Sequence, residues 1–117
     1  MVKSSKEVNR MLFEASFNGD VERVKKSLDL GANPNIKNEF GLTPLHFSVH
    51  KKQVEIMKFL IEHGADPNAK AVGEWTPLHE ATFVGNTDAL LLLLNNGADV
   101  NAITNFSESP ITHMLNN

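Results

Sequence analysis

The stretches GLTPLHFSVH, at residues 41–50, and EWTPLHEATF, at residues 74–83, share the tetrapeptide TPLH at an offset of 33 residues. A second motif keeps the same period, since GANPN begins at residue 31, GADPN at residue 64 and GADVN at residue 97. A fixed period of about 20–50 residues is the signature of repeat architectures. Two different motifs with one period therefore predict a chain built from repeated structural units.

The composition limits the classes of protein to which the chain can belong. Its 117 residues are 41% hydrophobic and 21% charged, as expected of one folded domain. A net charge of -3, with the basic residues scattered along the chain, gives no electrostatic basis for binding nucleic acid. The absence of cysteine excludes disulfides, thiolate zinc sites and thiol nucleophiles, and it is compatible with a reducing compartment.

No segment of the sequence has the pattern of an export signal or a membrane span. The start, MVKSSKEVNRMLFEAS, lacks the apolar core of a secretory signal. The longest apolar run, ALLLLL at 89–94, is much shorter than the roughly 20 residues of a spanning helix. We therefore expect a soluble protein with no membrane partner, located in the cytoplasm. The abundance of Asn and the excess of Lys over Arg are typical of AT-rich coding, as in a bacterial effector delivered to a host cell.

Each repeat unit predicts a pair of short helices followed by an extended loop. Thr43 can cap a helix in which Pro44 takes the first position, where its missing N–H costs nothing. The segment VEIMKFLIEHG, at 54–64, has apolar residues at helical spacing and ends on a glycine that suits a helix C-terminus. The following segment, ADPNAKAVGEW at 65–75, is rich in turn formers and predicts a hairpin-like loop, which we call a finger.

These motifs resemble those of the ankyrin-repeat family, which combines a TPLH helix start with a GADxN exit at a 33-residue period. The resemblance implies an all-α ankyrin-repeat solenoid of helix-turn-helix units with hairpin-like loops. About three and a half repeats are expected in a single domain spanning 1–117. The predicted units are an N-terminal capping repeat at 10–38, two repeats at 39–71 and 72–104, and a partial C-terminal repeat at 105–117, where SPIT at 109–112 replaces TPLH.

Two departures from the motif predict local differences between the units. Lys52 stands in the slot between the helices that glycine fills in the neighbouring units, so we expect a strained turn there. In the register of Phe40 and Gly41 the next unit has Gly73 and Glu74, so its finger is expected to bend differently.

The two ends of the array have different characters. In the first unit Arg23, Lys26 and Ser27 replace apolar residues of the sibling units, as expected of a capping repeat whose outer face meets water. Near the other end, Leu91 aligns with lysines of the sibling units. An apolar residue on a convex surface suggests either that the array continues or that the edge is buried. We therefore consider self-association through a C-terminal edge that contains Leu91 and Met114.

The histidines of the two TPLH motifs, His46 and His79, allow a metal-binding and a structural interpretation. Each lacks the further ligands that a metal site needs, whereas a neutral imidazole readily satisfies buried carbonyl groups. The family resemblance implies the structural role, in which the ring bonds to backbone near the next finger. His46 and His50 have the spacing of a metalloprotease motif, but the glutamate of that motif is absent.

The sequence contains no recognisable catalytic or cofactor-binding motif. Neither a glycine-rich phosphate loop nor a nucleophile elbow is present. We therefore predict no enzymatic activity, no cofactor and no metal. Asn35, Asn68 and Asn101 occupy the position that asparaginyl hydroxylases can modify in the family, and the simpler alternative is a turn-forming side chain that bonds local backbone.

The resemblance implies a protein-interaction module that binds through its finger tips and the concave face of its first helices. Phe17, His50 and Phe83 share one register on that face, and Trp75 is the strongest single candidate, unless it packs on its own finger. The alternative is a terminal piece of a longer ankyrin-repeat protein whose activity lies elsewhere. The predicted partner-binding residues are Trp75, Phe83, Phe40, His50, Phe17, Lys37, Glu39, Leu42, Lys51, Val72, Glu74 and Val84.

Overall fold

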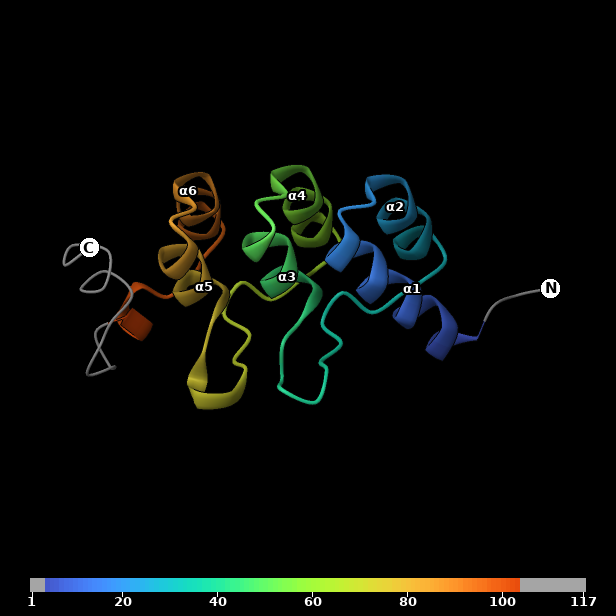
Figure 1. The fold of residues 1–117 in the computed structure, drawn as a ribbon, viewed down its shortest axis with the longest axis horizontal. Helices are drawn as coiled ribbons and strands as arrows, with labels where there is room; N and C mark the ends of the chain where they lie inside the picture. Colours follow the sequence, from blue (N-terminus) through green and yellow to red (C-terminus); the bar gives the residue numbers. More distant parts are fainter. Residues whose placement is uncertain (1–3, 104–117) are drawn as a thin grey trace.

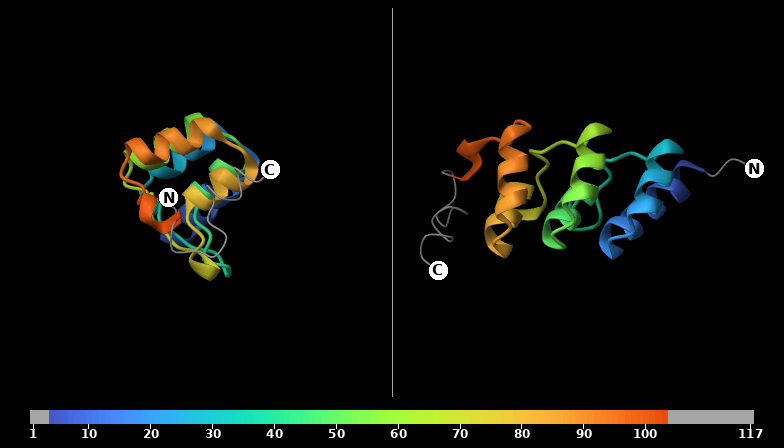
Figure 2. Two further views of the ribbon diagram at one scale, coloured as in Figure 1. Left: turned by 90° about the vertical axis from the view of Figure 1, so that its left-hand side faces the viewer. Right: turned by 90° about the horizontal axis from the view of Figure 1, so that it is seen from above.

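The computed structural model describes residues 4–103, which form a row of stacked helix pairs (Figure 1). Helices α1, α3 and α5 form an inner row beside the fingers, and α2, α4 and α6 form an outer row (Figures 1 and 2). The helices are α1 (Ser5–Asn18), α2 (Val21–Asp29), α3 (Pro44–His50), α4 (Val54–Glu62), α5 (Pro77–Val84) and α6 (Thr87–Asn95), with short 3-10 helices at Val72–Glu74 and Val100–Ile103. The all-α solenoid of helix pairs that the family resemblance implied is confirmed.

The ends of the array differ in part from the predicted units. Helix α1 begins at Ser5, capped by the side chain of Ser4, and so starts upstream of residue 10, the predicted start of the first unit. The predicted partial repeat at 105–117, including SPIT and Met114, lies outside the described residues.

The two TPLH motifs start helices α3 and α5 by the same local geometry. The Thr43 side chain accepts a hydrogen bond from the backbone N–H of His46, and Nδ1 of His46 accepts one from the backbone N–H of Thr43. Thr76 and His79 repeat this reciprocal arrangement at α5. Because both orphan amide groups are satisfied and proline takes the first position, the motif fixes where each inner helix begins.

The turns between paired helices use the left-handed backbone conformation. Gly19 and Gly85 adopt φ values of 73° and 71°, and Lys52 adopts 59° in the same slot. A residue with a Cβ atom pays about 1–2 kcal/mol to adopt this conformation. The strained turn predicted at Lys52 is therefore present.

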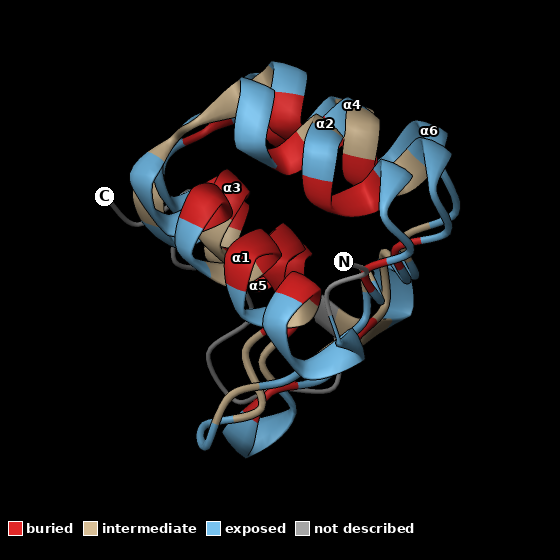
Figure 3. Ribbon diagram, turned by 90° about the vertical axis from the view of Figure 1, so that its right-hand side faces the viewer, coloured by how far each residue is buried: buried red, intermediate tan, exposed pale blue. Residues whose placement is uncertain are grey.

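The core lies between the two rows of helices, where buried residues recur at the repeat period (Figure 3). Leu12, Leu45 and Leu78 line it from the inner helices. The prediction that Arg23, Lys26 and Ser27 lie on an outer face that meets water was wrong for Ser27, which is buried in α2, whereas Arg23 and Lys26 are exposed. The Ser27 hydroxyl donates to the carbonyl of Arg23 or Val24 in its own helix, so burial leaves no unsatisfied polar atom there.

Asparagine side chains join the turns of successive units. Nδ2 of Asn35 donates to the carbonyl of Gly64 at 2.9 Å, and its Oδ1 accepts from the N–H of Asp66 at 2.7 Å. Asn68 makes the equivalent bonds one unit later, to Gly97 and Asp99. The predicted local turn role for these two side chains was therefore wrong, since each satisfies backbone of the next repeat.

Candidate functional site

A groove runs along the inner row of helices and is enclosed by α1, α3 and α5. Its volume is about 410 Å³ and its walls are mostly apolar. The residues that line it are Phe17, Leu42, His46, Phe47, His50, Lys51, Glu80 and Phe83. Phe17, His50 and Phe83, which share one register, therefore reach the same hollow from three different helices, as their spacing predicted.

The rings on one side of the groove form a small aromatic cluster. Phe47 of α3 packs edge-to-face against Phe13 and Phe17 of α1, at centroid distances of 5.2 and 5.7 Å. The ammonium group of Lys51 lies 4.6 Å from the centroid of the Phe17 ring, which is a cation–π distance. These contacts fix the orientation of Phe17, although half of its surface is exposed.

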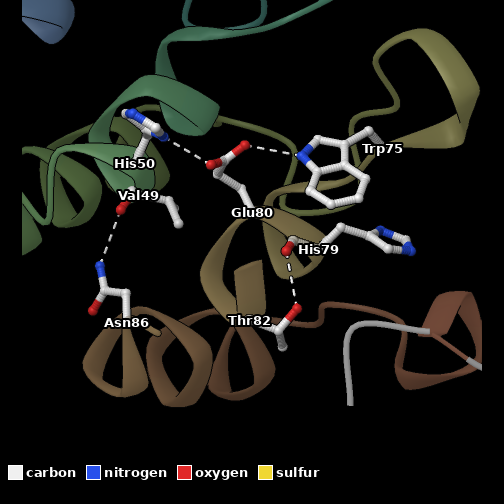
Figure 4. A network of polar contacts seen from close by, with 7 residues as sticks. All are labelled: Val49, His50, Trp75, His79, Glu80, Thr82 and Asn86. Atoms are coloured by element: carbon white, nitrogen blue, oxygen red, sulfur yellow. Dashed lines mark hydrogen bonds and ion pairs between the residues drawn. The ribbon is translucent and has the colours of Figure 1, made fainter. Parts of the chain in front are cut away.

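On the other side of the groove, Glu80 connects α5 and α3 with the finger at 65–75, which we call the third finger because it leads into the third unit (Figure 4). One carboxylate oxygen accepts from the Trp75 indole N–H at 2.9 Å, and the other lies 2.8 Å from Nδ1 of His50. The Glu80 side chain is only 13% exposed. Both oxygens are therefore committed to groups that hold the groove wall in shape.

Trp75 is half-buried and packs on its own unit. Its ring lies 5.1 Å from the imidazole of His79 and 6.0 Å from the ring of Phe83, the second contact being edge-to-face. Together with the bond to Glu80, these contacts agree with the packing alternative for Trp75. Trp75 does not line the groove, but it positions Phe83 and Glu80, which do.

His46 has the structural role that the family resemblance implied. Its Nδ1 accepts from the Thr43 amide, so Nε2 carries the proton and donates to the carbonyl of Trp75 at 2.8 Å. This bond ties α3 to the finger of the next unit. Burial lowers the pKa of His46, and burial followed by the nearby His46 lowers the pKa of His79.

The finger-tip candidates, apart from Leu42, lie outside the groove. Phe40 and Val72 are strongly exposed, and so are Lys37, Glu39 and Glu74. Two of these charged side chains have partners on the third finger, since Lys37 donates to the Lys70 carbonyl and Glu74 pairs with the Lys70 ammonium. Leu42 lines the groove, whereas Val84, at the end of α5, is half-buried and does not.

Sequence reasoning missed two residues of the groove, Phe47 and Glu80. They occupy one register, directly after the two TPLH motifs, so a comparison of the units at that slot would have revealed them. The role of the Glu80 carboxylate is harder to predict from the sequence than that of Phe47, because its partners, Trp75 and His50, come from a finger and from another helix.

The described residues form neither a metal-binding cluster nor a membrane-spanning helix. Within residues 4–103 no three His, Asp or Glu side chains come close enough together to hold a metal ion. In the same part of the chain, every helix is too short or too polar to cross a membrane.

Comparison with known proteins identifies the repeats. A family model described as ankyrin repeats in three copies matches residues 12–104. A search of curated protein sequences gave no match. Repeats of this kind are generally protein-protein interaction modules and are typically non-catalytic. The match spans most of the chain and all but the start of the stacked helix pairs, so this chain belongs to the ankyrin-repeat family.

Proposed function

We propose that this chain binds a partner protein through the inner-helix groove and the finger tips, without catalysing a reaction. The observation that carries the proposal is the set of large apolar side chains exposed on this face. Phe17, Phe40 and Phe83 are 50%, 57% and 58% exposed. Aromatic side chains dominate the energetics of protein interfaces because each buries a large area at low entropic cost.

The rigidity of the groove supports the same function. Phe17 is held by Phe47 and Lys51, and Phe83 is held by Trp75. Because these side chains are ordered before binding, little conformational entropy is lost when a partner covers them. A groove of this kind favours a partner that docks without a large change in the repeats.

The test is affinity capture of partner proteins with a groove variant. The double variant Phe17→Ala, Phe83→Ala removes both exposed rings, and Leu30→Ala removes an apolar side chain of similar exposure at the end of α2. We expect wild type and Leu30→Ala to retain the same protein, and the double variant to lose it. Isothermal titration with that protein should then show at least a tenfold higher Kd for each single Phe variant. Equal retention by the double variant would contradict the proposal.

A second proposal, that the chain associates with itself, is favoured by Leu91 of α6. Leu91 is 55% exposed, whereas its register equivalents in the other units are Lys25 and Lys58. The ammonium of Lys25 lies over the Phe59 ring of the next unit, so this slot faces the following repeat. We expect Leu91→Lys to lower the mass measured by light scattering at high protein concentration. A mass that is the same for both proteins would count against association at this edge.

A further inference from the structure

Some of the charged side chains that line the groove are already paired with neighbouring groups, and one is not. Its charged lining residues are Glu80, Lys51 and, when protonated, His50. Glu80 uses both oxygens on Trp75 and His50. Within residues 4–103, no carboxylate lies within ion-pair distance of the Lys51 ammonium, so Lys51 supplies the free charge of the groove.

Lys51 and Phe17 also line an adjoining hollow. That hollow is lined by Phe17, Asn18, Gly19, Lys51 and Gln53, and so it contains amide donors and no carboxylate. Glu14, which has the register of Glu80 on α1, lines neither hollow. An anion placed between the two hollows would therefore meet a cation and amide groups without an opposing charge.

The Lys51 ammonium lies beside the exposed ring of Phe17, so one ligand can contact both. The ammonium lies 4.6 Å from the centroid of the half-exposed Phe17 ring. A ligand that covers the Phe17 ring thus brings its neighbouring groups to the ammonium. Such a contact excludes water from the charge and strengthens its attraction for a carboxylate.

From this arrangement we infer that the groove recognises an acidic-hydrophobic segment of the partner protein. An aromatic or leucine side chain of the segment packs on Phe17 and Phe47, and an adjacent Asp or Glu carboxylate pairs with Lys51. This inference rests on the proposed function and adds the chemistry of the ligand. Because the net charge of the chain is -3, selectivity comes from the local ammonium and not from long-range attraction, which salt screens beyond about 10 Å.

The test is selection of random short peptides displayed on phage against the purified full chain at neutral pH. We compare wild type with Lys51→Glu, and use Lys58→Glu, an equal change of charge on the exposed side of α4, as the matched control. Wild type and Lys58→Glu should enrich peptides in which an aromatic residue or leucine stands beside Asp or Glu. Lys51→Glu should lose the acidic preference.

Binding of one selected peptide, measured by fluorescence anisotropy, sharpens the result. Lys51→Glu and Phe17→Ala should each raise its Kd at least tenfold. Lys51→Arg should bind the peptide about as tightly as wild type, because it keeps the charge and the cation–π contact. Circular dichroism checks that each variant is folded. No enrichment, enrichment without acidic residues, or an unchanged Kd for Lys51→Glu would overturn the inference. Dependence on Phe17 and Phe83 without dependence on Lys51 would leave the proposed function standing, whereas independence of all three would contradict both.

Discussion

The second finger, at 32–42 before α3, and the third finger, at 65–75 before α5, occupy the same register but are closed by different turn chemistry. In the second, the N–H of Asn38 donates to the carbonyl of Leu42, and in the third Ala71 bonds Trp75 in the same way. The side chain of Asn38 then accepts from the amides of Phe40 and Leu42, a role that Ala71 has no group to perform. The third finger instead closes through the 3-10 turn at Val72–Glu74.

The difference extends to the residue that makes the left-handed turn. Gly41 has a φ of 77° and Glu74, in the same slot, has a φ of 59°. A Cβ atom at Gly41 would lie 3.0 Å from the Cα of Ala71, whereas one at Gly73 would meet nothing within 4 Å. The second finger is thus constrained by its backbone angle and by its neighbour, which it also bonds through Phe40 and Val72. Equivalent slots in a repeat array therefore carry different physical demands.

The largest expected effect comes from filling the contact between the fingers. Gly41→Ala should lower the free energy of unfolding by about 2–4 kcal/mol, since it combines left-handed strain with displacement of the Ala71 backbone. Gly73→Ala, at a φ of 72° in open space, should cost only about 1 kcal/mol. Urea denaturation monitored by circular dichroism measures both. Equal costs would show that the fingers do not constrain each other.

The next effect concerns the bond from His46 to Trp75, which ties α3 to the third finger. The pKa values of His46 and His79 in the fold lie below the ordinary 6.5, so the unfolded chain binds more protons below that pH. Stability should therefore be complete above about pH 6.5 and should fall as the pH drops from there toward the folded-state values. A proton added to Nδ1 of His46 also abolishes its bond from the Thr43 amide.

Urea midpoints measured between about pH 7.5 and 5.5, above the range in which carboxylates titrate, test this pH dependence. His46→Gln should be less stable than wild type but should show a shallower loss toward acid. His63→Gln serves as the control, because His63 is exposed and its Nδ1 bonds the carbonyl of Phe59 at the end of α4. A wild-type midpoint that is constant over this range would contradict the assignment of buried neutral histidines.

A smaller effect is expected from the side chain that closes only the second finger. Asn38→Ala removes the acceptor for two backbone amides and should cost about 1 kcal/mol, because both amides then rely on water. Asn38→Asp keeps an acceptor oxygen and should remain close to wild type. Hydrogen exchange of the Phe40 and Leu42 amides reports the change locally. Unaltered exchange in Asn38→Ala would mean that the turn is held by its backbone alone.

The features that the sequence predicted correctly are those set within one repeat. The helix starts at the TPLH motifs, the strained turn at Lys52 and the altered third finger each depend on residues a few positions apart. The period then placed Phe17, His50 and Phe83 on one face, because stacked identical units bring equivalent residues together. The bond from His46 to the next finger came from the family resemblance.

The features that the sequence did not predict depend on contacts between repeats. Ser27 is polar, yet it is buried in the slot that Leu60 and Leu93 fill in the other units, and its own helix satisfies the hydroxyl. Asn35 suits a local turn, but its partners lie 29 and 31 residues away. No motif marks Glu80 in the sequence, and only the fold brings Trp75 and His50 to its two oxygens. Local propensity carries no information about such partners.

The smallest expected effect is a gain in stability, opposite in sign to the loss expected for Gly41→Ala, and it tests backbone strain alone. Glu74→Gly should raise the free energy of unfolding by about 0.5 kcal/mol, because it relieves left-handed strain while the added freedom of the unfolded chain offsets part of the gain. The exposed pair of Glu74 with Lys70, at 3.6 Å, contributes little to stability. Glu74→Gln, which removes the charge and keeps the strain, should match wild type in urea denaturation. A loss of stability in both variants would show that the ion pair, and not the turn, decides the conformation of the third finger.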